Sequence, residues 1–545
     1  MRVHFVGIAG AGMHSLALYL SELGHEVSGS DVCIDESRRA FWADRGVTVY
    51  DSQVAENIAG ADLVVYSSAI RRSNPERAAA EALGIAQSRG EVLARFANAH
   101  PFSIAVCGTH GKGTTAAAIS FILSMLGHRV SHILGAVPIG EREPCVCVPG
   151  AEFLVSEVDE SDKTHLHHVP KVLLINNVEA DHLDVYGDLE SIVDSFEVHV
   201  RRVLAAGAAV VIHYAGVGAG LLYERLADCS SIYWIVPDGA DSPVRAPDLA
   251  YEIAEPDGSG HCRVTLRDCG GDICQLLPAL CGRANAQNLV SAIGVAIVCG
   301  MEMKQAASVL PRYRGLCDRC EVQRIGDVLL ATDYASHPTC VENDIAWLRK
   351  RAKRVIAVYH PYRYSLLSHH WDALCHALAA ADGVYLFPLD SGGEPVVAGI
   401  SSEAMAAGIC AIRERSARAF DSCEALYDVL SRDVESDDLV VVFSGGEVFA
   451  KVRERLEAAR SAKKPRVAQK TREAQKSRVA QKTREAQKTA KPKNRSIKSK
   501  NASLKSRVAA WGCGGLVPRK KTARSAKNAR SAKNAKPKKR KNRHA

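Results

Sequence analysis

The sequence predicts an α/β protein with three domains, over residues 1–100, 101–310 and 311–460, and a basic tail over 461–545. Short apolar runs alternate with helical patterns along residues 1–460, and polar or glycine-rich segments follow several of these runs. Such alternation is typical of doubly wound parallel sheets, which bind ligands at the carboxyl ends of their strands. The first and third domains are expected to be Rossmann-like, and the central one resembles a phosphate-loop ATPase domain.

Charge is distributed unevenly along the chain. Of the 70 Lys and Arg, 30 lie in residues 461–545 together with only two acids, so the tail carries a net charge of +28 and residues 1–460 carry −19. The sequence at 466–477 is nearly repeated at 478–489, and such a composition cannot bury a core, so we expect the tail to be disordered or transiently helical. It resembles histone H1-like tails. It is either a non-specific contact for nucleic acid or another anionic polymer, or a solvated appendage.

Several features favour a cytoplasmic protein. The N-terminus enters an apolar strand directly, without the pattern of a signal peptide. The longest uncharged stretch, 203–223, is rich in Ala and Gly and contains His213, so we expect a buried turn and strand and no membrane span. The 17 cysteines are scattered, mostly in apolar runs, as is typical of reduced thiols, and the lone Cys317–Cys320 pair has no partner at zinc spacing.

The first domain opens with a strand at 3–6, a glycine turn over 7–12 and a helix extending to residue 23. A second strand, 26–28, leads to Asp31, which completes a βαβ unit with an acid after its second strand. The glycines allow the backbone to approach a pyrophosphate, and Asp31 can accept a hydrogen bond from a ribose or a neighbouring hydroxyl. After a later strand at 63–66, Ser67 and Ser68 either reach the same ligand or serve as ordinary turn residues.

A phosphate-binding loop is predicted at the start of the second domain. A buried strand at 104–107 breaks into GTHGKGTT at 108–115, and an alanine-rich helix follows at once. Backbone N–H groups, the helix N-terminus and the Lys112 ammonium all favour phosphate, so we expect a nucleoside triphosphate here and not a simple turn. The loop residues are Gly108, Thr109, His110, Gly111, Lys112, Gly113, Thr114 and Thr115.

Acidic clusters follow two further strands of the second domain. EVDESD at 157–162 follows one strand, and NNVEADH at 176–182 follows the strand at 172–175. Because the carboxyl ends of parallel strands meet at one edge of the sheet, Glu157 and His182 can converge with Thr114 on Mg²⁺. The alternative is a solvated acidic loop and a surface histidine.

The remaining polar clusters are less specific. Asn285 and Asn288 lie one turn apart at the start of an apolar helix, where their amides can read a base edge or simply cap the helix. In the third domain, polar residues at 333–339 and 360–364 follow the strands expected at 328–331 and 355–359. Three α/β units with polar strand ends suggest a ligase whose substrates meet between domains.

These motifs, taken in order, resemble those of the Mur ligases over residues 1–460, and especially those of the branch that adds L-alanine to UDP-N-acetylmuramate. The resemblance is carried by HFVGIAGAGM at 4–13, SGSD at 28–31, SSAI at 67–70, SNPE at 73–76, RGEVLA at 89–94, GTHGK at 108–112, EVDESD at 157–162, NNVEADHLDVYG at 176–187, GRANAQN at 282–288, RGLCDRCE at 314–321, DYASHPT at 333–339 and HPYRYS at 360–365.

The resemblance implies an ATP- and Mg²⁺-dependent ligase in peptidoglycan synthesis, with phosphoryl transfer to the muramyl carboxylate and attack of an amine on the acyl phosphate. It implies that the first domain binds the UDP-sugar through Gly10, Gly12, Met13, Asp31, Ser67 and Ser68. Lys112 and the threonines would hold the ATP phosphates, while Thr114, Glu157 and His182 would ligate Mg²⁺. Asn285, Asn288 and Arg319 would contact the nucleotide, and His337 and Arg363 the amino acid.

Some positions depart from the family pattern. Gly113 stands where a threonine usually follows the loop lysine, which leaves Thr114 to supply the metal-binding hydroxyl. Ala284 and Asp318 replace a histidine and an arginine on the nucleotide side. Ser336 and Leu366 replace a histidine and an arginine at the amino-acid end, so glycine and serine stay open as acceptors.

Three alternatives remain. The first is a related ligase that reattaches recycled peptide to the muramyl sugar. The second is a folylpolyglutamate synthetase-like ligase, against which SGSD, SSAI and the complete UDP-sugar domain argue. The third is a degenerate homologue that binds nucleic acid or a wall polymer through its tail, against which Lys112, Glu157, His182 and Arg319 argue.

Overall fold

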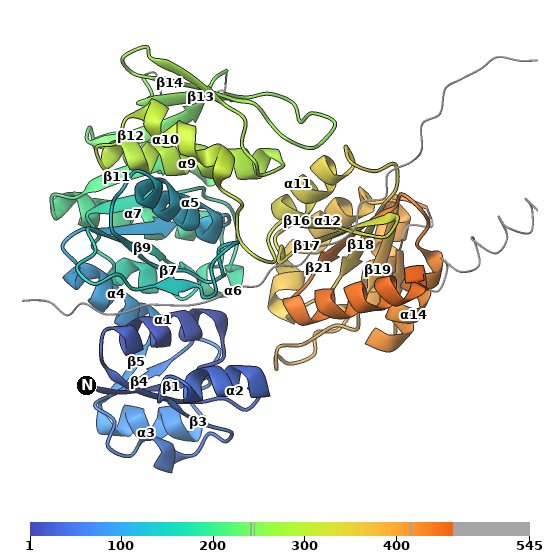
Figure 1. The fold of residues 1–545 in the computed structure, drawn as a ribbon, viewed down its shortest axis with the longest axis horizontal. Helices are drawn as coiled ribbons and strands as arrows, with labels where there is room; N and C mark the ends of the chain where they lie inside the picture. Colours follow the sequence, from blue (N-terminus) through green and yellow to red (C-terminus); the bar gives the residue numbers. More distant parts are fainter. Residues whose placement is uncertain (240–241, 245, 415–416, 462–545) are drawn as a thin grey trace, which may run out of the picture. The chain divides into compact units, whose positions relative to one another are not determined.

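The structure is a computed structural model that describes residues 1–239, 242–244, 246–414 and 417–461. The predictions for residues 462–545 therefore lie outside the described residues. In the described part the strands form three sheets, each built from one continuous stretch of sequence (Figure 1). The predicted α/β class with three units is confirmed.

The first sheet is parallel throughout and has the strand order β3-β2-β1-β4-β5. The direction of winding changes between β1 and β4, and this switch point is where such sheets bind ligands. The turn 7–10 follows β1, and Ser67 follows β4. The elements are β1 (Arg2–Val6), α1 (Ala11–Glu22), β2 (Glu26–Ser30), α2 (Glu36–Ala43), β3 (Thr48–Tyr50), η1 (Ala55–Ile58), β4 (Leu63–Tyr66), α3 (Pro75–Leu83), β5 (Ala86–Ser88) and α4 (Arg89–Ala99).

The helix ends of this unit follow from local sequence. Asn74 caps α3 by accepting from the N–H groups of Glu76 and Arg77, and Pro75 occupies the first turn, where no N–H is needed. Ser88 and Glu91 form a capping box at the start of α4. These caps hold both helices against the sheet edge that carries the glycine turn.

The second sheet has ten strands in the order β15-β14-β13-β12-β11-β10-β6-β9-β7-β8. The fully buried β6 lies between the parallel strands β9 and β10, so the loops after these three strands meet at one edge. The elements are β6 (Ser103–Cys107), α5 (Lys112–Met125), β7 (Val130–Ile133), β8 (Cys145–Val146), β9 (Phe153–Glu157), η2 (Thr164–His167), β10 (Val172–Ile175), α6 (Leu183–Tyr186), α7 (Leu189–Ala205), β11 (Ala209–His213), α8 (Gly218–Arg225), β12 (Ile232–Pro237), β13 (Leu249–Ile253), β14 (Val264–Asp268), β15 (Ile273–Leu276), α9 (Arg283–Val298), α10 (Met303–Val309) and η3 (Leu310–Arg312).

Helices α5 and α9 pack together over this sheet (Figure 1). Their facing surfaces are rich in alanine, and Ala116, Ala118, Ala292 and Ala296 are fully buried in one hydrophobic cluster. Small side chains let the two helix backbones approach closely. This packing fixes the phosphate loop at the start of α5 next to the first turn of α9.

The third sheet has the order β16-β17-β21-β18-β19-β20 and is parallel apart from the β16–β17 hairpin. The carboxyl ends of β17 and β18 bring Asp333 and His360 to the same edge. The elements are β16 (Glu321–Ile325), β17 (Val328–Asp333), α11 (Pro338–Leu348), β18 (Val355–Tyr359), α12 (Tyr364–Ala379), β19 (Gly383–Leu386), α13 (Ser402–Ile412), β20 (Ala417–Ala419), α14 (Cys423–Asp433) and β21 (Leu439–Phe443). Residues 446–461 are helical.

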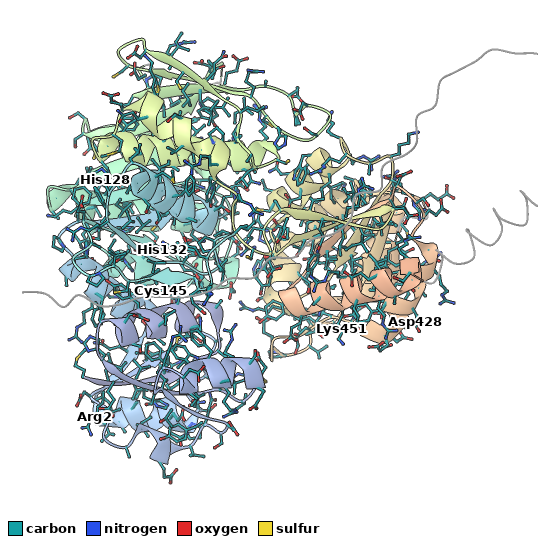
Figure 2. The ribbon with its side chains drawn as sticks, in the orientation of Figure 1. Arg2, His128, His132, Cys145, Asp428 and Lys451 are labelled. Carbon is teal, nitrogen blue, oxygen red and sulfur yellow. The ribbon has the colours of Figure 1, made fainter. Side chains whose placement is uncertain are left out.

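The first and second units share a hydrophobic cluster. Ile133, Cys145 and Leu154 of the second sheet pack with apolar residues of α1. Figure 2 labels Cys145 where β8 meets α1. Apolar burial across this boundary stabilises the contact at roughly 25 cal/mol per Å² of area removed from water.

The uncharged stretch 203–223 forms the end of α7, the strand β11 and the start of α8. The predicted strand is confirmed by β11, and the helix that follows it was not anticipated. None of the helices in the described residues has the length and apolar character needed to cross a membrane. The cysteines of the described residues are all free.

Candidate functional site

A cavity of about 560 Å³ collects polar residues from all three units. The first unit contributes the glycine turn and Ser67, and the second contributes the phosphate loop and the segments after β9 and β10. The predicted residues that line it are Gly10, Gly12, Met13, Ser67, Thr109, His110, Gly111, Lys112, Gly113, Thr114, Glu157, His182, Asn285, Asn288, Arg319 and His337. Motifs more than 300 residues apart in sequence therefore meet at one site.

The phosphate loop has a backbone that only glycine allows at two positions. Gly108 has φ 131° and Gly111 has φ 74°. A Cβ at Gly111 would lie 2.2 Å from Oδ1 of Asn288, and one at Gly108 would lie 2.9 Å from the backbone N of Asn177. The loop is thus pressed against α9 and the segment after β10, with the first turn of α5 facing the cavity.

Lys112 is held inside this loop. Its Nζ donates to the carbonyl oxygens of Gly108 and Thr109, at 2.9 and 3.3 Å, and to Oε1 of Glu160 at 3.0 Å. Burial lowers the pKa of Lys112, but Glu160 and Asp159 outweigh it and hold the pKa above its usual value. The ammonium therefore stays charged where a phosphate can replace Glu160 as its partner.

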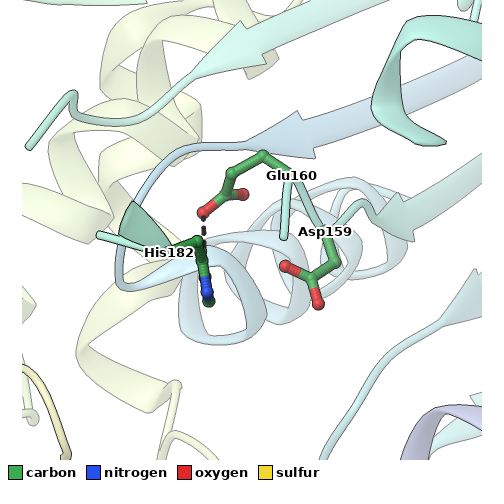
Figure 3. A group of neighbouring side chains, drawn as sticks. All are labelled: Asp159, Glu160 and His182. Atoms are coloured by element: carbon green, nitrogen blue, oxygen red, sulfur yellow. Dashed lines mark ion pairs between the residues drawn. The ribbon is translucent and has the colours of Figure 1, made fainter. Parts of the chain in front are cut away.

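Asp159, Glu160 and His182 form a compact group (Figure 3). Their ligand atoms all lie within 4.8 Å of one another, and Nε2 of His182 is 3.9 Å from Oε1 of Glu160. Lys112 lies beside this group, with Nζ 3.8 Å from Asp159 and 3.0 Å from Glu160. Burial raises the pKa of Glu160 to about 8, against the attraction of Lys112. Asp159 behaves oppositely, because Lys112 and Arg89 outweigh desolvation and lower its pKa to about 2.

Glu157 lies beside Gly113, which precedes Thr114 in the first turn of α5. Oε2 of Glu157 accepts from the N–H of Gly135 at 2.7 Å, and a Cβ at Gly113 would lie 3.1 Å from the same oxygen. Of the predicted metal ligands, His182 groups closely with Asp159 and Glu160, while Glu157 is not part of that group; Thr114, Glu157 and His182 all line the same cavity. These oxygen-rich donors fit a hard cation such as Mg²⁺, which needs few protein ligands when it also binds phosphate.

Thr115 differs from the rest of the loop. It is fully buried and is not among the residues that line the cavity. Thr114 lines the cavity, and its carbonyl oxygen accepts from the Tyr313 hydroxyl at 3.0 Å. Between the two threonines, Thr114 is the one that can face a ligand.

The two asparagines of α9 are both at the cavity, but they are not equivalent. Oδ1 of Asn288 accepts from Nδ2 of Asn176 at 3.0 Å, while Asn285 donates to the carbonyl of Cys281 at 2.9 Å. Asn288 is therefore tied to the segment after β10 and to Gly111. Asn285 caps a turn and is the more accessible of the two.

Asp31 and Ser68 are not among the lining residues. The carboxylate of Asp31 accepts from the backbone N–H groups of Ala9 and Cys33, both at 3.0 Å. It therefore braces the glycine turn from behind. The βαβ pattern in the sequence could not distinguish this structural role from a direct contact with the ligand.

The third unit contributes Arg319 and His337. Nη1 of Arg319 lies 3.8 Å from Asp333, and its guanidinium stands over the Tyr334 ring. His337 caps α11 and lies 3.2 Å from the carbonyl of Ala180 in the second unit.

Arg363 is placed differently. It has φ 61°, its Nε donates to Glu394 at 2.8 Å, and it is not among the residues lining the cavity. The guanidinium of Arg363 is therefore paired with Glu394, an acid that the sequence pattern did not link to the site.

A second cavity, of about 660 Å³, adjoins the first. The residues that line both cavities are Ala11, Gly135, Ala136, Arg319 and Tyr334. His14 lines the second cavity, contacts Glu143 at 2.9 Å and packs against the rings of Phe41 and Trp42. Burial lowers its pKa.

Several residues of the site were not singled out from the sequence. Asp159 and Glu160 belong to the acidic cluster in which only Glu157 was chosen, and Glu179 and Asp181 lie just before His182. Asp333 ends β17 and lines the cavity. Their position directly after strands could have marked these acids as candidates. The sequence alone does not show which acid of a run faces the cavity.

The three sheets and the shared cavity define a class of protein: a multidomain α/β protein with a phosphate loop at the meeting point of its units. Family models agree with this division. The first matches residues 2–101 (Mur ligase family, catalytic domain), the second 106–296 (Mur ligase middle domain) and the third 318–446 (Mur ligase, glutamate ligase domain).

Individual proteins match over most of the chain. A UDP-N-acetylmuramate–L-alanine ligase of Gloeobacter violaceus is 33% identical over 468 residues, which cover 84% of this chain and 95% of that protein. One of Symbiobacterium thermophilum is 32% identical, with coverages of 86% and 96%. The chain therefore belongs to the Mur ligase family.

Solved structures share the fold. A UDP-N-acetylmuramate–alanine ligase of Thermotoga maritima superposes with a TM-score of 0.68 at 21% identity, covering 85% of this chain and all of that one. A murein peptide ligase of Psychrobacter arcticus gives a TM-score of 0.62 at 23% identity, with coverages of 84% and 98%. At these identities the likeness concerns the fold alone.

Proposed function

We propose that the protein is an ATP-dependent ligase that joins L-alanine to the carboxylate of UDP-N-acetylmuramate in peptidoglycan precursor synthesis. The observation that carries the proposal is the cavity in which the phosphate loop meets polar residues of all three units. Relatives about one third identical over nearly their whole length bear this activity in their names. ATP and nucleotide sugars are cytosolic metabolites, so we also place the protein in the cytoplasm.

The proposed reaction has two steps. A muramyl carboxylate oxygen attacks the γ-phosphorus of ATP, the bond to ADP breaks, and an acyl phosphate forms. The neutral amine of alanine then attacks the acyl carbon, phosphate leaves, and the nitrogen loses a proton as the amide forms. Both steps place charge near the phosphate loop, where Lys112 and the N–H groups of α5 neutralise it.

We propose that Mg²⁺ binds with ATP at Thr114, Glu157 and His182, with Asp159 and Glu160 completing the acidic wall. Bound there, the ion would neutralise phosphate charge as a Lewis acid. When phosphate binds, Lys112 exchanges its contact with Glu160 for one with phosphate. The raised pKa of Glu160 means that the released carboxyl can take up a proton and avoid a buried charge.

Each unit has a proposed partner. Residues 1–100 bind the UDP-sugar with Gly10, Gly12, Met13 and Ser67, while Asp31 braces the turn and Ser68 stays a candidate. Residues 101–310 bind ATP, with Asn285 and Asn288 near the base and Arg319 reaching over from residues 311–460. His337 is the candidate at the amino-acid end, and Arg363 could serve there only after leaving Glu394.

Phosphate release by the purified protein tests the proposal. With ATP and Mg²⁺, release should depend on UDP-N-acetylmuramate and be fastest with L-alanine; parallel reactions contain glycine or L-serine. Faster release with glycine or serine would reassign the acceptor, in keeping with Ser336 and Leu366. Absence of sugar-dependent release with any of the three would overturn the ligase proposal.

A further inference from the structure

One acid beside the cavity joins the second and third units, although the proposed reaction gives it no role. Glu179 follows β10, and its side chain is only 14% exposed. Oε1 lies 3.2 Å from Nε2 of His110 in the phosphate loop, and Oε2 accepts from the hydroxyl of Thr339 at 2.7 Å. The same oxygen lies 3.8 Å from Nδ1 of His337.

The backbone of Glu179 is also tied to the phosphate loop. Its N–H donates to Oγ1 of Thr109 at 2.9 Å, and the Thr109 hydroxyl donates to its carbonyl at 3.3 Å. The residue therefore cannot move without moving the loop. On the other side, His337 and Thr339 form the cap and first turn of α11, so the contact reaches the third unit at the start of a helix.

A second acid repeats the arrangement two residues later. Asp181 lies 3.7 Å from Nε2 of His182, a candidate metal ligand, and 3.6 Å from Nε2 of His370 on α12. His370 and His337 pack edge to face, with ring centroids 4.9 Å apart. The two contacts form a continuous polar seam between the segment after β10 and helices α11 and α12.

We propose that Glu179 is a positioning residue that holds α11 against the phosphate loop. This contact would position the third unit correctly relative to the ATP phosphates for the reaction. This rests on the proposed ligase function. The carboxylate is a bridge: one oxygen contacts the phosphate loop, and the other contacts α11. A residue that only stabilised the second unit would not need the contact with α11. Because misplacement of reacting groups by about 1 Å can cost about 100-fold in rate, loss of the bridge should lower kcat more than binding.

Four variants test the proposal. Glu179→Ala removes both contacts, Thr339→Val removes only the hydroxyl on the α11 side, and Thr339→Ser keeps that hydroxyl. Glu190→Ala, at an exposed acid of α7, is the surface control. We expect Glu179→Ala and Thr339→Val to lower kcat at least tenfold with KM for the UDP-sugar changed less than twofold, and Thr339→Ser to retain at least half of the wild-type kcat.

The double variant Glu179→Ala/Thr339→Val decides whether the two residues act together. If they share one contact, the double variant should be no slower than the slower single variant. Multiplied losses, or equal losses in Thr339→Ser and Thr339→Val, would overturn the bridge.

Hydrogen exchange gives a readout that does not depend on the reaction. In the ligand-free full chain, Thr339→Val should raise amide exchange both at 337–341 and at 108–111, whereas Thr339→Ser should not. Increased exchange confined to the α11 side would mean a local structural role and overturn the proposal. If the exchange result holds but the wild type releases no phosphate, the ligase function fails and the bridge stands.

Discussion

At the scale of single residues, Lys112 shows how an ammonium stays charged although it is buried. Its closest carboxylate is Glu160, and the two side chains are only 12% and 4% exposed. We expect Lys112→Ala to lower phosphate release at least about 100-fold, since the charge on the transferred phosphoryl group loses its fixed partner. UDP-sugar binding, measured by calorimetry, should change little because we propose that the first unit binds the sugar.

The same substitution should also affect stability. Breaking a buried ion pair by removing one partner typically costs about 3–5 kcal/mol when the remaining charge is buried alone, and uptake of a proton by Glu160, whose pKa burial raises, reduces this cost. We expect Lys112→Ala to lower the melting temperature and Lys112→Ala/Glu160→Gln to recover part of the loss without recovering activity. If the double variant melts no higher than the single one, Glu160 is not the charge that Lys112 compensates.

Gly111 offers a second test at this scale, with a matched control. Gly111 has a φ of 74°, and the Cβ of an alanine there would lie 2.2 Å from Oδ1 of Asn288. Gly24 has a similar φ of 83°, but the Cβ of an alanine there would have no atom within 4 Å. Left-handed backbone costs a non-glycine residue about 1–2 kcal/mol, so both variants should lose that stability. Only Gly111→Ala should also weaken ATP binding, by about tenfold or more, which corresponds to about 1.4 kcal/mol. Equal ATP affinity in the two variants would mean that the close approach to Asn288 is unimportant.

At the scale of secondary-structure elements, η2 and α7 enclose three buried histidines. The rings of His165 and His199 lie 5.3 Å apart, and Nε2 of His199 donates to the carbonyl of His168 at 2.9 Å. Burial lowers the pKa of His165 to about 3 and that of His199 to about 4, and it also lowers the pKa of His168. The contact between these elements therefore depends on neutral imidazoles.

This cluster sets the direction of the pH dependence. The unfolded chain binds protons on these histidines below about pH 6.5, while the folded chain does not until about pH 4. Stability from the cluster is thus fully present above about pH 6.5 and is lost as the pH falls, by up to about 1.4 kcal/mol per pH unit for each histidine. Scanning calorimetry at pH 7.5, 6 and 5 should show the melting temperature of the second unit falling.

His199→Gln keeps a donor for the His168 carbonyl but cannot take up the proton, so its melting temperature should fall less steeply. His376→Gln, at an exposed position on α12, should behave like the wild type. A His199→Gln variant as acid-sensitive as the wild type would place the acid sensitivity elsewhere in the chain.

At the scale of the whole molecule, the sequence predicted three α/β units, the glycine turn and the phosphate loop, because these depend on local periodicity and on glycine spacing. Which acid of a run faces the cavity depends on the twist of the strand end and on its neighbours. Glu157 thus contacts Gly135 while Glu160 contacts Lys112, and Asp31 turned out to brace the turn. Contacts between units, such as Glu179 with Thr339, join segments that no local pattern relates.

The tail, residues 461–545, poses the last question at this scale, and its sequence charge suggests an answer. It carries a large excess of Lys and Arg, whereas residues 1–460 are acidic. We propose that it attracts nucleic acid or another polyanion without sequence preference and takes no part in the ligase reaction. A protein making 6–10 phosphate contacts loses about 10³–10⁵ in affinity between 50 and 200 mM salt, so the attraction should be strongly salt-dependent.

Deleting residues 461–545 tests this assignment. The full chain should be retained on immobilised double-stranded DNA and on heparin at 50 mM salt and released by about 200 mM, while the truncated chain should pass through both columns. Phosphate release by the truncated chain should stay within about twofold of the full chain, because the cavity is lined by residues 10–347 only. Retention of the truncated chain would locate a basic surface on the acidic body, and loss of turnover would show that the tail supports the reaction.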